Sequence, residues 1–324
     1  MADPVLLADR TDAPHAPAAR SGRRGASRPG AVRARRREAA WGLAFIAPNL
    51  LGLAVFYLWP IVQNLWFSFT EWSVFGAKTF AGLANYVEMV GDRELWRAFG
   101  HTGLYALMVV PGSIVAALAL AVLLARRSTV RSVYRVILLL PMVTMPAATA
   151  LIWKWLLNSD YGLVNAALEG VGLGTRVWLA GPLALVSVAV VGVWSTVGYN
   201  IVILLAGLDT IDSSLYEAAA IDGAGRWTTL TRITLPLLTP SIFFLTVTSL
   251  INALQVFDLI FMMIGPTNPA IRVSQSVVYY FYDVSFVSGA KGYGASIAVV
   301  LFLVILLITV VQLRLQRRWV FYAS

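Results

Sequence analysis

Two apolar segments of this sequence each carry a short group of hydroxyl, amide and aromatic side chains. One group lies in segment 177–208, where Asn200 clusters with three of the residues named below and Trp194 is nearby. The other lies in segment 233–257 with i, i+4, i+7 spacing, which places its members on one face of a helix. Such groups bind polyhydroxy solutes by hydrogen bonding and aromatic contact, but they also bond helices to one another inside membranes. Both interpretations stay open for these candidate solute-contacting residues, which are Ser195, Thr196, Tyr199, Thr248, Asn252 and Gln255.

Residues suited to bond-breaking chemistry or metal binding are not grouped anywhere in the sequence. The segment Gly76-Ala77-Lys78-Thr79 lacks the adjacent Gly-Lys of a phosphate-binding loop, and His15 and His101 are isolated from other ligands. Zero cysteines exclude disulfides and thiolate metal sites. We therefore expect no catalytic residue and no metal site. Asp258 is a weaker candidate, because a carboxylate near a segment end is expected to pair with a cation or to contact water.

The elements that position these groups are predicted to be membrane helices. The chain is 59% hydrophobic and 13% charged, which is too apolar for a soluble protein of 324 residues. Six segments without Lys, Arg, Asp or Glu have the length needed to cross a bilayer, and they lack the alternation of barrel strands. We predict an all-α integral membrane bundle with kinks at its prolines and spans at 39–70, 98–125, 136–153, 177–208, 233–257 and 292–313.

Charge places the predicted spans in a definite orientation. Eighteen Lys and Arg residues lie in the two termini and the 126–135 and 209–235 connections, against six in the alternate connections. Both termini are therefore expected in the cytoplasm. We divide the chain into a disordered basic arm (1–40), a first span with an outer loop (41–98), a core (99–313) and a tail (314–324). The arm is expected to contact anionic lipid rather than nucleic acid.

The outer loop of 71–97 mixes charged residues with aromatic ones. Trp72, Phe80, Tyr86 and Trp96 lie in it, and a second aromatic group, with Trp153 and Trp155, precedes the turn at 158–162. Trp and Tyr favour the head-group level of a bilayer, so interfacial anchoring is the simpler interpretation. Contact with a docked extracellular protein is the alternative, and the sequence does not separate the two.

The connection 209–236 is predicted to hold two short helices. Ser214 and Glu217 have the S-x-x-E spacing of a capping box, and Gly223 is suited to the left-handed end of a helix that runs to about Asp222. A second helix is expected to run toward Ile233 and to stop at Pro236. Helices this short need packing partners, which are either a groove of another protein or this bundle itself. The apolar anchors would be Leu215, Tyr216 and Ile221, beside the small face of Ala218, Ala219 and Ala220.

The stretch Glu217-Ala218-Ala219-Ala220-Ile221-Asp222-Gly223, followed by Ile233-Thr234-Leu235-Pro236, resembles the cytoplasmic EAA loop of permease subunits from binding-protein-dependent ABC importers. Leu205-Ala206-Gly207-Leu208-Asp209 and Val256-Phe257-Asp258-Leu259-Ile260 are similar to the carbohydrate-uptake branch, which includes maltose and glycerol-phosphate permeases. The resemblance covers about residues 41–322. One departure is Gly265-Pro266-Thr267-Asn268-Pro269, where relatives often carry a longer glycine run.

The resemblance implies a type I permease fold in the inner membrane of a prokaryote and a role as half of a sugar path. It implies that Glu217, Ala218, Ala219, Asp222 and Gly223 couple to an ATPase dimer, which would hold the ATP and Mg. The other implied partners are a second homologous permease and an extracytoplasmic solute-binding protein. The alternatives are a permease for glycerol phosphate or a polyol, a secondary transporter, for which mid-membrane carboxylates are scarce, and a membrane enzyme, which would need a catalytic cluster.

Overall fold

The structure is a computed structural model that describes residues 29–72, 76–124 and 131–320 of the chain. It divides into two units, Met1–Pro60 and Ile61–Ser324, and each is described by itself. Five helices have the length and apolar composition of membrane spans, and a bent helix pair is a sixth candidate. These observations confirm the predicted helical membrane fold. The five are Ala40–Phe67, Arg93–Leu124, Leu183–Asp209, Arg226–Leu254 and Lys291–Arg317.

The first unit contains helix α1 (Pro29–Leu53), a π-helical turn η1 (Ala54–Leu58) and the first two residues of α2 (Trp59–Phe67). The predicted arm is therefore helical over residues 29–40, and the prediction of disorder was wrong there. Residues 31–40 are mostly Ala, Arg and Glu, which are strong helix formers and extend a helix once the apolar segment has nucleated it. The remainder of the arm, 1–28, lies outside the described residues.

Proline positions explain two π-helical turns. Pro60 and Pro236 each lie two residues after such a turn, η1 in the first case and η2 (Leu230–Thr234) in the second. A proline ring clashes with the carbonyl four residues earlier, and a widened turn relieves that clash. The chain thus continues from α10 (Arg226–Thr229) through η2 into α11 (Leu235–Leu254), and the predicted stop at Pro236 was wrong.

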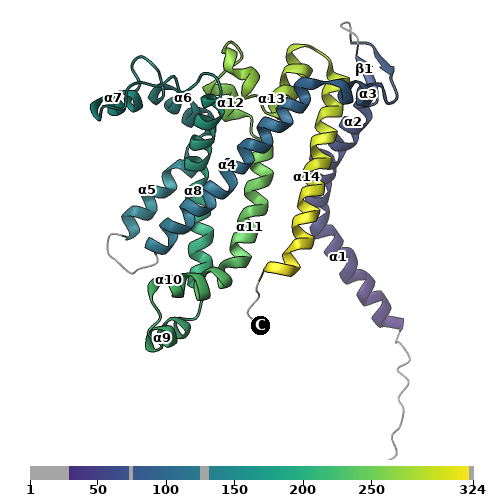
Figure 1. Cartoon of the computed structure of the whole chain (residues 1–324). Coiled ribbons are helices and arrows are strands. Elements are labelled where there is room, and N and C mark those ends of the chain that lie inside the picture. The colour runs from purple at the N-terminus through teal and green to yellow at the C-terminus, as the bar shows by residue number, and fades with distance from the viewer. Residues whose placement is uncertain (1–28, 73–75, 125–130, 321–324) are drawn as a thin grey trace, which may run out of the picture. The chain divides into compact units, whose positions relative to one another are not determined.

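The core of the second unit is formed by α4 (Arg93–Leu124), α8 (Leu183–Asp209) and α11, which pack against one another (Figure 1). Small and branched residues fill their contacts, so that the helix backbones approach closely, as is usual in membrane bundles. Fully buried members include Ala117, Ala121, Ala184, Val188, Leu204 and Leu245. The core fixes the positions of the polar residues that face away from it.

The third predicted span is broken. Helix α5 (Arg131–Val143) and helix α6 (Pro146–Leu156) meet at an angle of 107°. Met145 has extended backbone angles, because the residue before a proline avoids the helical region, and Pro146 starts the new helix. The prediction that Pro146 only kinks a continuous span was therefore wrong.

Short elements connect the spans at one end of the second unit, which we call the outer end after the predicted orientation. Strands β1 (Thr70–Trp72) and β2 (Lys78–Phe80) form an antiparallel hairpin in which Thr70 pairs with Phe80. The other outer elements are α3 (Ala84–Gly91), α7 (Leu163–Gly170), α12 (Asp258–Met263), η3 (Pro269–Val273), α13 (Val277–Tyr282) and η4 (Asp283–Val287).

Helix α14 (Lys291–Trp319) packs along α11 and reaches the outer end beside β1, α3 and α13. A Cβ atom at Gly292 would clash with the Thr70 carbonyl oxygen, so glycine permits the contact between α14 and β1. Helix α9 (Ser213–Ile221) and α10 lie at the opposite, inner end (Figure 1). Just after the turn at Gly265, which departs from the family pattern, the side-chain amide nitrogen of Asn268 donates to the Leu179 carbonyl at 2.9 Å and ties this loop to the segment before α8.

Candidate functional site

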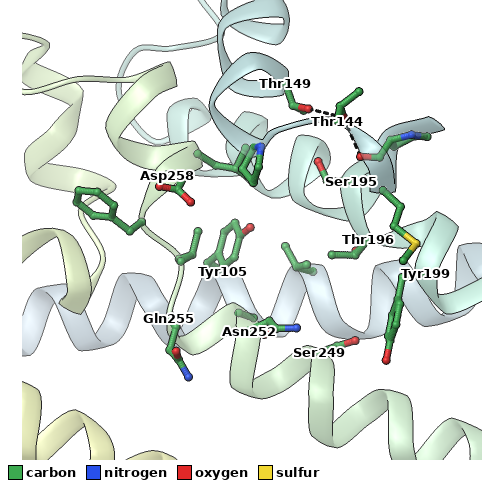
Figure 2. A pocket seen from close by; sticks show the side chains of 18 residues that line it. Tyr105, Thr144, Thr149, Ser195, Thr196, Tyr199, Ser249, Asn252, Gln255 and Asp258 are labelled. Carbon is green, nitrogen blue, oxygen red and sulfur yellow. Dashed lines mark hydrogen bonds between the residues drawn. The ribbon is translucent and has the colours of Figure 1, made fainter. Parts of the chain in front are cut away.

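A cleft of about 470 Å³ lies among α4, α8, α11 and the turn between α5 and α6 (Figure 2). Four separate parts of the chain contribute polar groups to it, and Tyr105 extends into the middle of them in the view of Figure 2. The polar lining residues are Tyr105, Thr144, Thr149, Ser195, Thr196, Tyr199, Ser249, Asn252, Gln255 and Asp258.

The cleft contains five of the six candidate solute-contacting residues, namely all except Thr248. The hydroxyl of Thr248 donates to the Phe244 carbonyl at 3.0 Å within its own helix. The next residue, Ser249, lines the cleft in its place. Of the three predicted positions in segment 233–257, only the first therefore differs, because Asn252 and Gln255 line the cleft as expected.

Two hydroxyl groups that α8 contributes to the cleft already donate hydrogen bonds within that helix. Ser195 donates to the Val191 carbonyl at 2.8 Å, and Thr196 donates to the Gly192 carbonyl at 2.9 Å. Each oxygen still has a lone pair with which to accept a further hydrogen bond. These two residues therefore present acceptors to the cleft, and a solute hydroxyl would be their donor.

The amide groups of the cleft are free to act both as donors and as acceptors. In the part of the chain that the structure describes, the side chains of Asn252 and Gln255 make no hydrogen bond, and both residues are exposed. Asn200, one residue after Tyr199, differs, because it is fully buried and its amide nitrogen donates to Ser113 Oγ of α4 at 3.1 Å. Asn200 thus bonds one helix to another, whereas Asn252 and Gln255 face open space.

Asp258 contributes a carboxylate to the same cleft. It lies in the first turn of α12, and no cationic group lies within ion-pairing distance among the described residues. The neighbouring Lys154 donates instead to the Met262 carbonyl at 3.3 Å. Of the two expected environments for Asp258, the structure therefore favours contact with the solvent of the cleft.

Sequence reasoning missed Tyr105, Thr144, Thr149 and Ser249. Thr144 and Thr149 share a hydrogen bond of 2.9 Å across the break between α5 and α6. The pair Pro141 and Pro146 within one apolar segment was the available signal, since interrupted membrane helices commonly line polar cavities. Tyr105 had no such signal, because an isolated tyrosine in an apolar helix is also typical of a core.

The inner end carries the predicted pair of short helices, α9 and α10, which we call the inner hairpin. Asp212 rather than Ser214 caps α9, because its carboxylate accepts a hydrogen bond from the Ser214 amide at 3.0 Å. This contact holds the pKa of Asp212 below its usual value. The predicted capping box was therefore wrong by two positions, and the exposed side chain of Glu217 makes no hydrogen bond among the described residues.

The end of α9 follows the sequence expectation. Gly223 has a φ of +70°, its amide donates to the Ala220 carbonyl at 3.1 Å, and the Ala224 amide donates to the Ala219 carbonyl at 2.9 Å. This pair of bonds is the Schellman arrangement, which requires a left-handed residue after the helix. Gly223 fixes the direction in which the chain leaves α9.

The three consecutive alanines of α9 do not share a face. Ala219 is buried in the hairpin, whereas Ala218 and Ala220 are exposed. Tyr216 turns inward, with its hydroxyl 3.3 Å from Thr234 Oγ1, and is not an outward anchor. The large exposed apolar residues of the inner hairpin are Leu215, Ile221 and Trp227, of which Ile221 is 87% exposed and Trp227 75%.

A bundle of membrane helices with a polar cleft among them and an exposed helical hairpin at one end is the architecture expected of the membrane subunit of a transporter. The chain belongs to the family of binding-protein-dependent transport system inner membrane components, whose model matches residues 111–321. It is thus a multi-pass membrane permease of the ABC importer class, as the resemblance implied.

Relatives with known names share most of their length with this chain. The trehalose/maltose transport system permease protein MalF of Thermococcus litoralis is 33% identical over 87% of this chain and 95% of its own. The sulfoquinovosyl glycerol permease SmoG of Agrobacterium fabrum is 33% identical over 84% and 89%. The sn-glycerol-3-phosphate permease UgpA of Yersinia pestis is 30% identical over 86% and 94%.

The fold matches a solved structure over nearly its whole length. A chain of a bacterial alginate ABC transporter, crystallised in complex with an alginate pentasaccharide-bound periplasmic protein, superposes with a TM-score of 0.79. The match covers 90% of this chain and 99% of the other at 22% sequence identity, so it supports the fold alone.

Proposed function

We propose that this permease imports a carbohydrate and that the cleft of Figure 2 lines its half of the path. The observation that carries the proposal is the set of groups in the cleft that can still form hydrogen bonds or ring contacts with a solute. Asn252 and Gln255 offer free amides, Ser195 and Thr196 offer acceptors, and Tyr199 offers an aromatic ring. Sugars need hydroxyl and amide partners together with an aromatic surface. Thr248 lies outside this group.

The inner hairpin is proposed to couple the permease to an ATPase. Glu217, Ala218, Asp222 and Gly223 lie on its exposed surface, and Ile221 and Trp227 provide an apolar contact area. An amphipathic helix of this kind suits a groove on a partner. Ala219 would act indirectly, because its burial fixes the packing of α9.

The remaining proposed partners are those that the family resemblance implies. A second, homologous permease would complete the path, two ATPase subunits would bind ATP and Mg, and an extracytoplasmic binding protein would deliver the solute. ATP binding would close the ATPase dimer and move the inner hairpin, so that the bundle turns from inward-facing to outward-facing. The required free energy comes from the different affinities of the ATPases for ATP in the two states.

A matched pair of variants tests the path. Asn252→Ala removes a free amide from the cleft, and Thr248→Ala removes a hydroxyl four residues earlier that lies outside it. Because one hydrogen bond contributes about 0.5–1.5 kcal/mol, Asn252→Ala should lower uptake by roughly twofold to tenfold. Thr248→Ala should leave uptake unchanged. Equal losses, or losses that follow the amount of protein in the membrane, would contradict the path assignment.

Glu217→Ala tests the coupling surface. Uptake and solute-stimulated ATP hydrolysis should fall while assembly and abundance stay normal, because the Glu217 carboxylate has no intramolecular hydrogen bond to lose in the described structure. Glu169→Ala, an exposed glutamate on α7 at the outer end, is the control. Loss of abundance in Glu217→Ala alone would instead indicate a role within the chain.

A panel of labelled solutes tests the substrate class. Uptake by cells that contain the complete importer should be found among neutral mono-, di- and oligosaccharides. An importer whose ATPase cannot hydrolyse ATP is the control for passive entry. Uptake of glycerol phosphate or a polyol, with no sugar transported, would select the alternative substrate class.

A further inference from the structure

One face of α3 is apolar and uncovered. Leu83, just before the helix, and Val87 and Val90 within it are spaced as i, i+4 and i+7 and therefore share this face. They are 64%, 71% and 76% exposed. The opposite face holds Asn85 and Met89, which are buried in the second unit. We call Leu83, Val87 and Val90 the α3 stripe.

The α3 stripe continues at both ends onto membrane-spanning helices. On one side Phe80 lies three residues before Leu83, and its ring stacks on that of Trp66 with centroids 6.1 Å apart. Trp66 is in the last turn of the span Ala40–Phe67. Trp96 continues the stripe on the other side, in the first turns of the span Arg93–Leu124, and its indole nitrogen donates to the Val90 carbonyl at 3.3 Å.

Hydrogen bonds fix the position of α3 beside the ends of the first two spans. The Asn85 amide nitrogen donates to the Ser68 carbonyl at 2.9 Å and to the Thr70 carbonyl at 3.0 Å, directly after the first span. At the other end, Asp92 accepts from the Glu94 amide at 2.9 Å and thereby caps the second span. The α3 stripe is thus fixed beside the ends of both spans.

The aromatic residues of this outer loop differ in their contacts and in their exposure. The amine of Lys78 lies 4.3 Å from the Trp72 ring, and the Tyr86 hydroxyl donates to Ser68 Oγ at 2.7 Å, so both rings are engaged within the chain. Phe80 and Trp96 remain 71% and 54% exposed and border the α3 stripe. Of these four rings, the two largely exposed ones are therefore those that continue the apolar face.

We propose that α3 is an interfacial helix whose stripe lies in the outer leaflet, at the boundary between head groups and acyl chains. Continuity with two membrane spans favours lipid over a docked protein, because Trp66 and Trp96 mark the interfacial level at both ends of the stripe. Helices of this type bury their apolar face about 5–10 Å into that boundary. Glu88, on the adjacent exposed face, would remain in water.

Single-cysteine labelling tests the proposal in the assembled importer, since this chain has no cysteine of its own. Bimane at Val87→Cys, in vesicles of phosphatidylcholine that is brominated near the carbonyl end of its acyl chains, should be quenched at least about twofold, as expected of a side chain in the interface. Aqueous iodide should have little effect on it. Glu88→Cys is the matched control and should respond to iodide but not to bromolipid.

Val90→Cys provides a second position if Val87→Cys does not accumulate, and it should give the same result because Val90 is the most exposed member of the stripe. Equal quenching of Val87→Cys and Glu88→Cys by iodide would overturn the proposal. So would shielding of position 87 that arises only after the binding protein is added, since that result would make the α3 stripe a protein-docking surface.

Discussion

The outer elements and the inner hairpin are stabilised in different ways. At the outer end, Asp92 accepts hydrogen bonds of 2.6 Å from both Tyr280 and Tyr293, which lie 188 and 201 residues away in the sequence. The Val277 amide donates to Thr102 Oγ1 at 2.9 Å across a similar separation. We call the contacts of Asp92 with the two tyrosines the outer clasp, because they join the start of α4 to α13 and α14.

The inner hairpin is held by local contacts. Its cap at Asp212 and its end at Gly223 use hydrogen bonds between residues two to five positions apart in the sequence. The contact of 3.3 Å between the Tyr216 hydroxyl and Thr234 Oγ1 joins residues only 18 positions apart. Large apolar residues remain exposed on it. A segment with few long-range contacts and uncovered apolar residues opens and moves more easily than a segment joined to distant elements. The difference suits a rigid outer end and a hairpin completed by a partner.

The largest effect is expected from breaking the local geometry of the inner hairpin. Gly223→Pro should abolish solute-stimulated ATP hydrolysis, because proline cannot adopt a φ of +70° and lacks the amide that bonds Ala220. Gly225→Ala is the control, since Gly225 has a φ of −69° and open space around it. Full stimulated activity in Gly223→Pro would show that the direction of the chain after α9 does not matter for coupling.

Breaking the outer clasp should destabilise the folded subunit. In the importers that remain folded, transport should stay coupled to ATP hydrolysis. Asp92→Asn removes the charge that two tyrosine hydroxyls share, and hydrogen bonds to a charged group contribute about 1.5–3 kcal/mol each. A fall in the thermal transition of the purified importer by several degrees is the expected result, with Glu88→Gln as the control. An unchanged transition would mean that the clasp is not a stabilising contact.

The loss of thermal stability in Asp92→Asn should depend on pH in a way that identifies the carboxylate of Asp92 as its cause. Partial burial raises the pKa of Asp92, but the hydrogen bonds from Tyr280, Tyr293 and the backbone amides of Leu95 and Glu94 together outweigh it, so the pKa lies below the ordinary value of 3.8. Burial and the Asp92 contact raise the pKa of Tyr280 above its ordinary value of 10.0. A depressed carboxyl pKa stabilises the fold above the unfolded pKa, and this contribution disappears as the pH falls through the folded pKa.

The difference in thermal transition between the native chain and Asp92→Asn should therefore be constant between about pH 5 and pH 9. It should shrink only in stronger acid, where Asp92 itself becomes protonated. Thermal scans of both proteins across this range measure the difference directly. A difference that disappears near neutral pH would require another titrating group and would contradict the assignment to Asp92.

The sequence predicted the helical class, five spans close to their observed bounds and the left-handed glycine at the end of α9. These features depend on apolar length and on local backbone geometry, which neighbouring residues determine. Two features were predicted wrongly, namely the break between α5 and α6 and the continuation of the helix through Pro236. Both depend on whether a proline ends a helix, kinks it or widens one of its turns. That outcome is decided by packing against other helices, which no local pattern contains.

The candidate cleft illustrates the same limit. All three predicted positions on α8 line the cleft, but on α11 the residue that lines it is Ser249 rather than Thr248. Neighbouring positions on a helix point about 100° apart, and which of them faces the cleft is set by the contacts of α11 with α4, α8 and α14. The outer clasp was not predictable for a related reason, since it joins residues about two hundred positions apart that belong to separate elements.

The smallest effects are expected when one tyrosine hydroxyl is removed from the outer clasp and one from the inner hairpin. Tyr280→Phe removes a hydrogen bond of 2.6 Å to a carboxylate, and Tyr216→Phe removes a neutral contact of 3.3 Å to a hydroxyl. The first should cost about 1.5–3 kcal/mol of stability and the second about 0.5 kcal/mol, since charge strengthens a hydrogen bond and length weakens it. Thermal transitions of the two variants, measured in one preparation of the importer, give the comparison. If Tyr216→Phe lowers the transition as much as Tyr280→Phe, the inner hairpin is held as firmly as the outer clasp, and its mobility cannot be the basis of coupling.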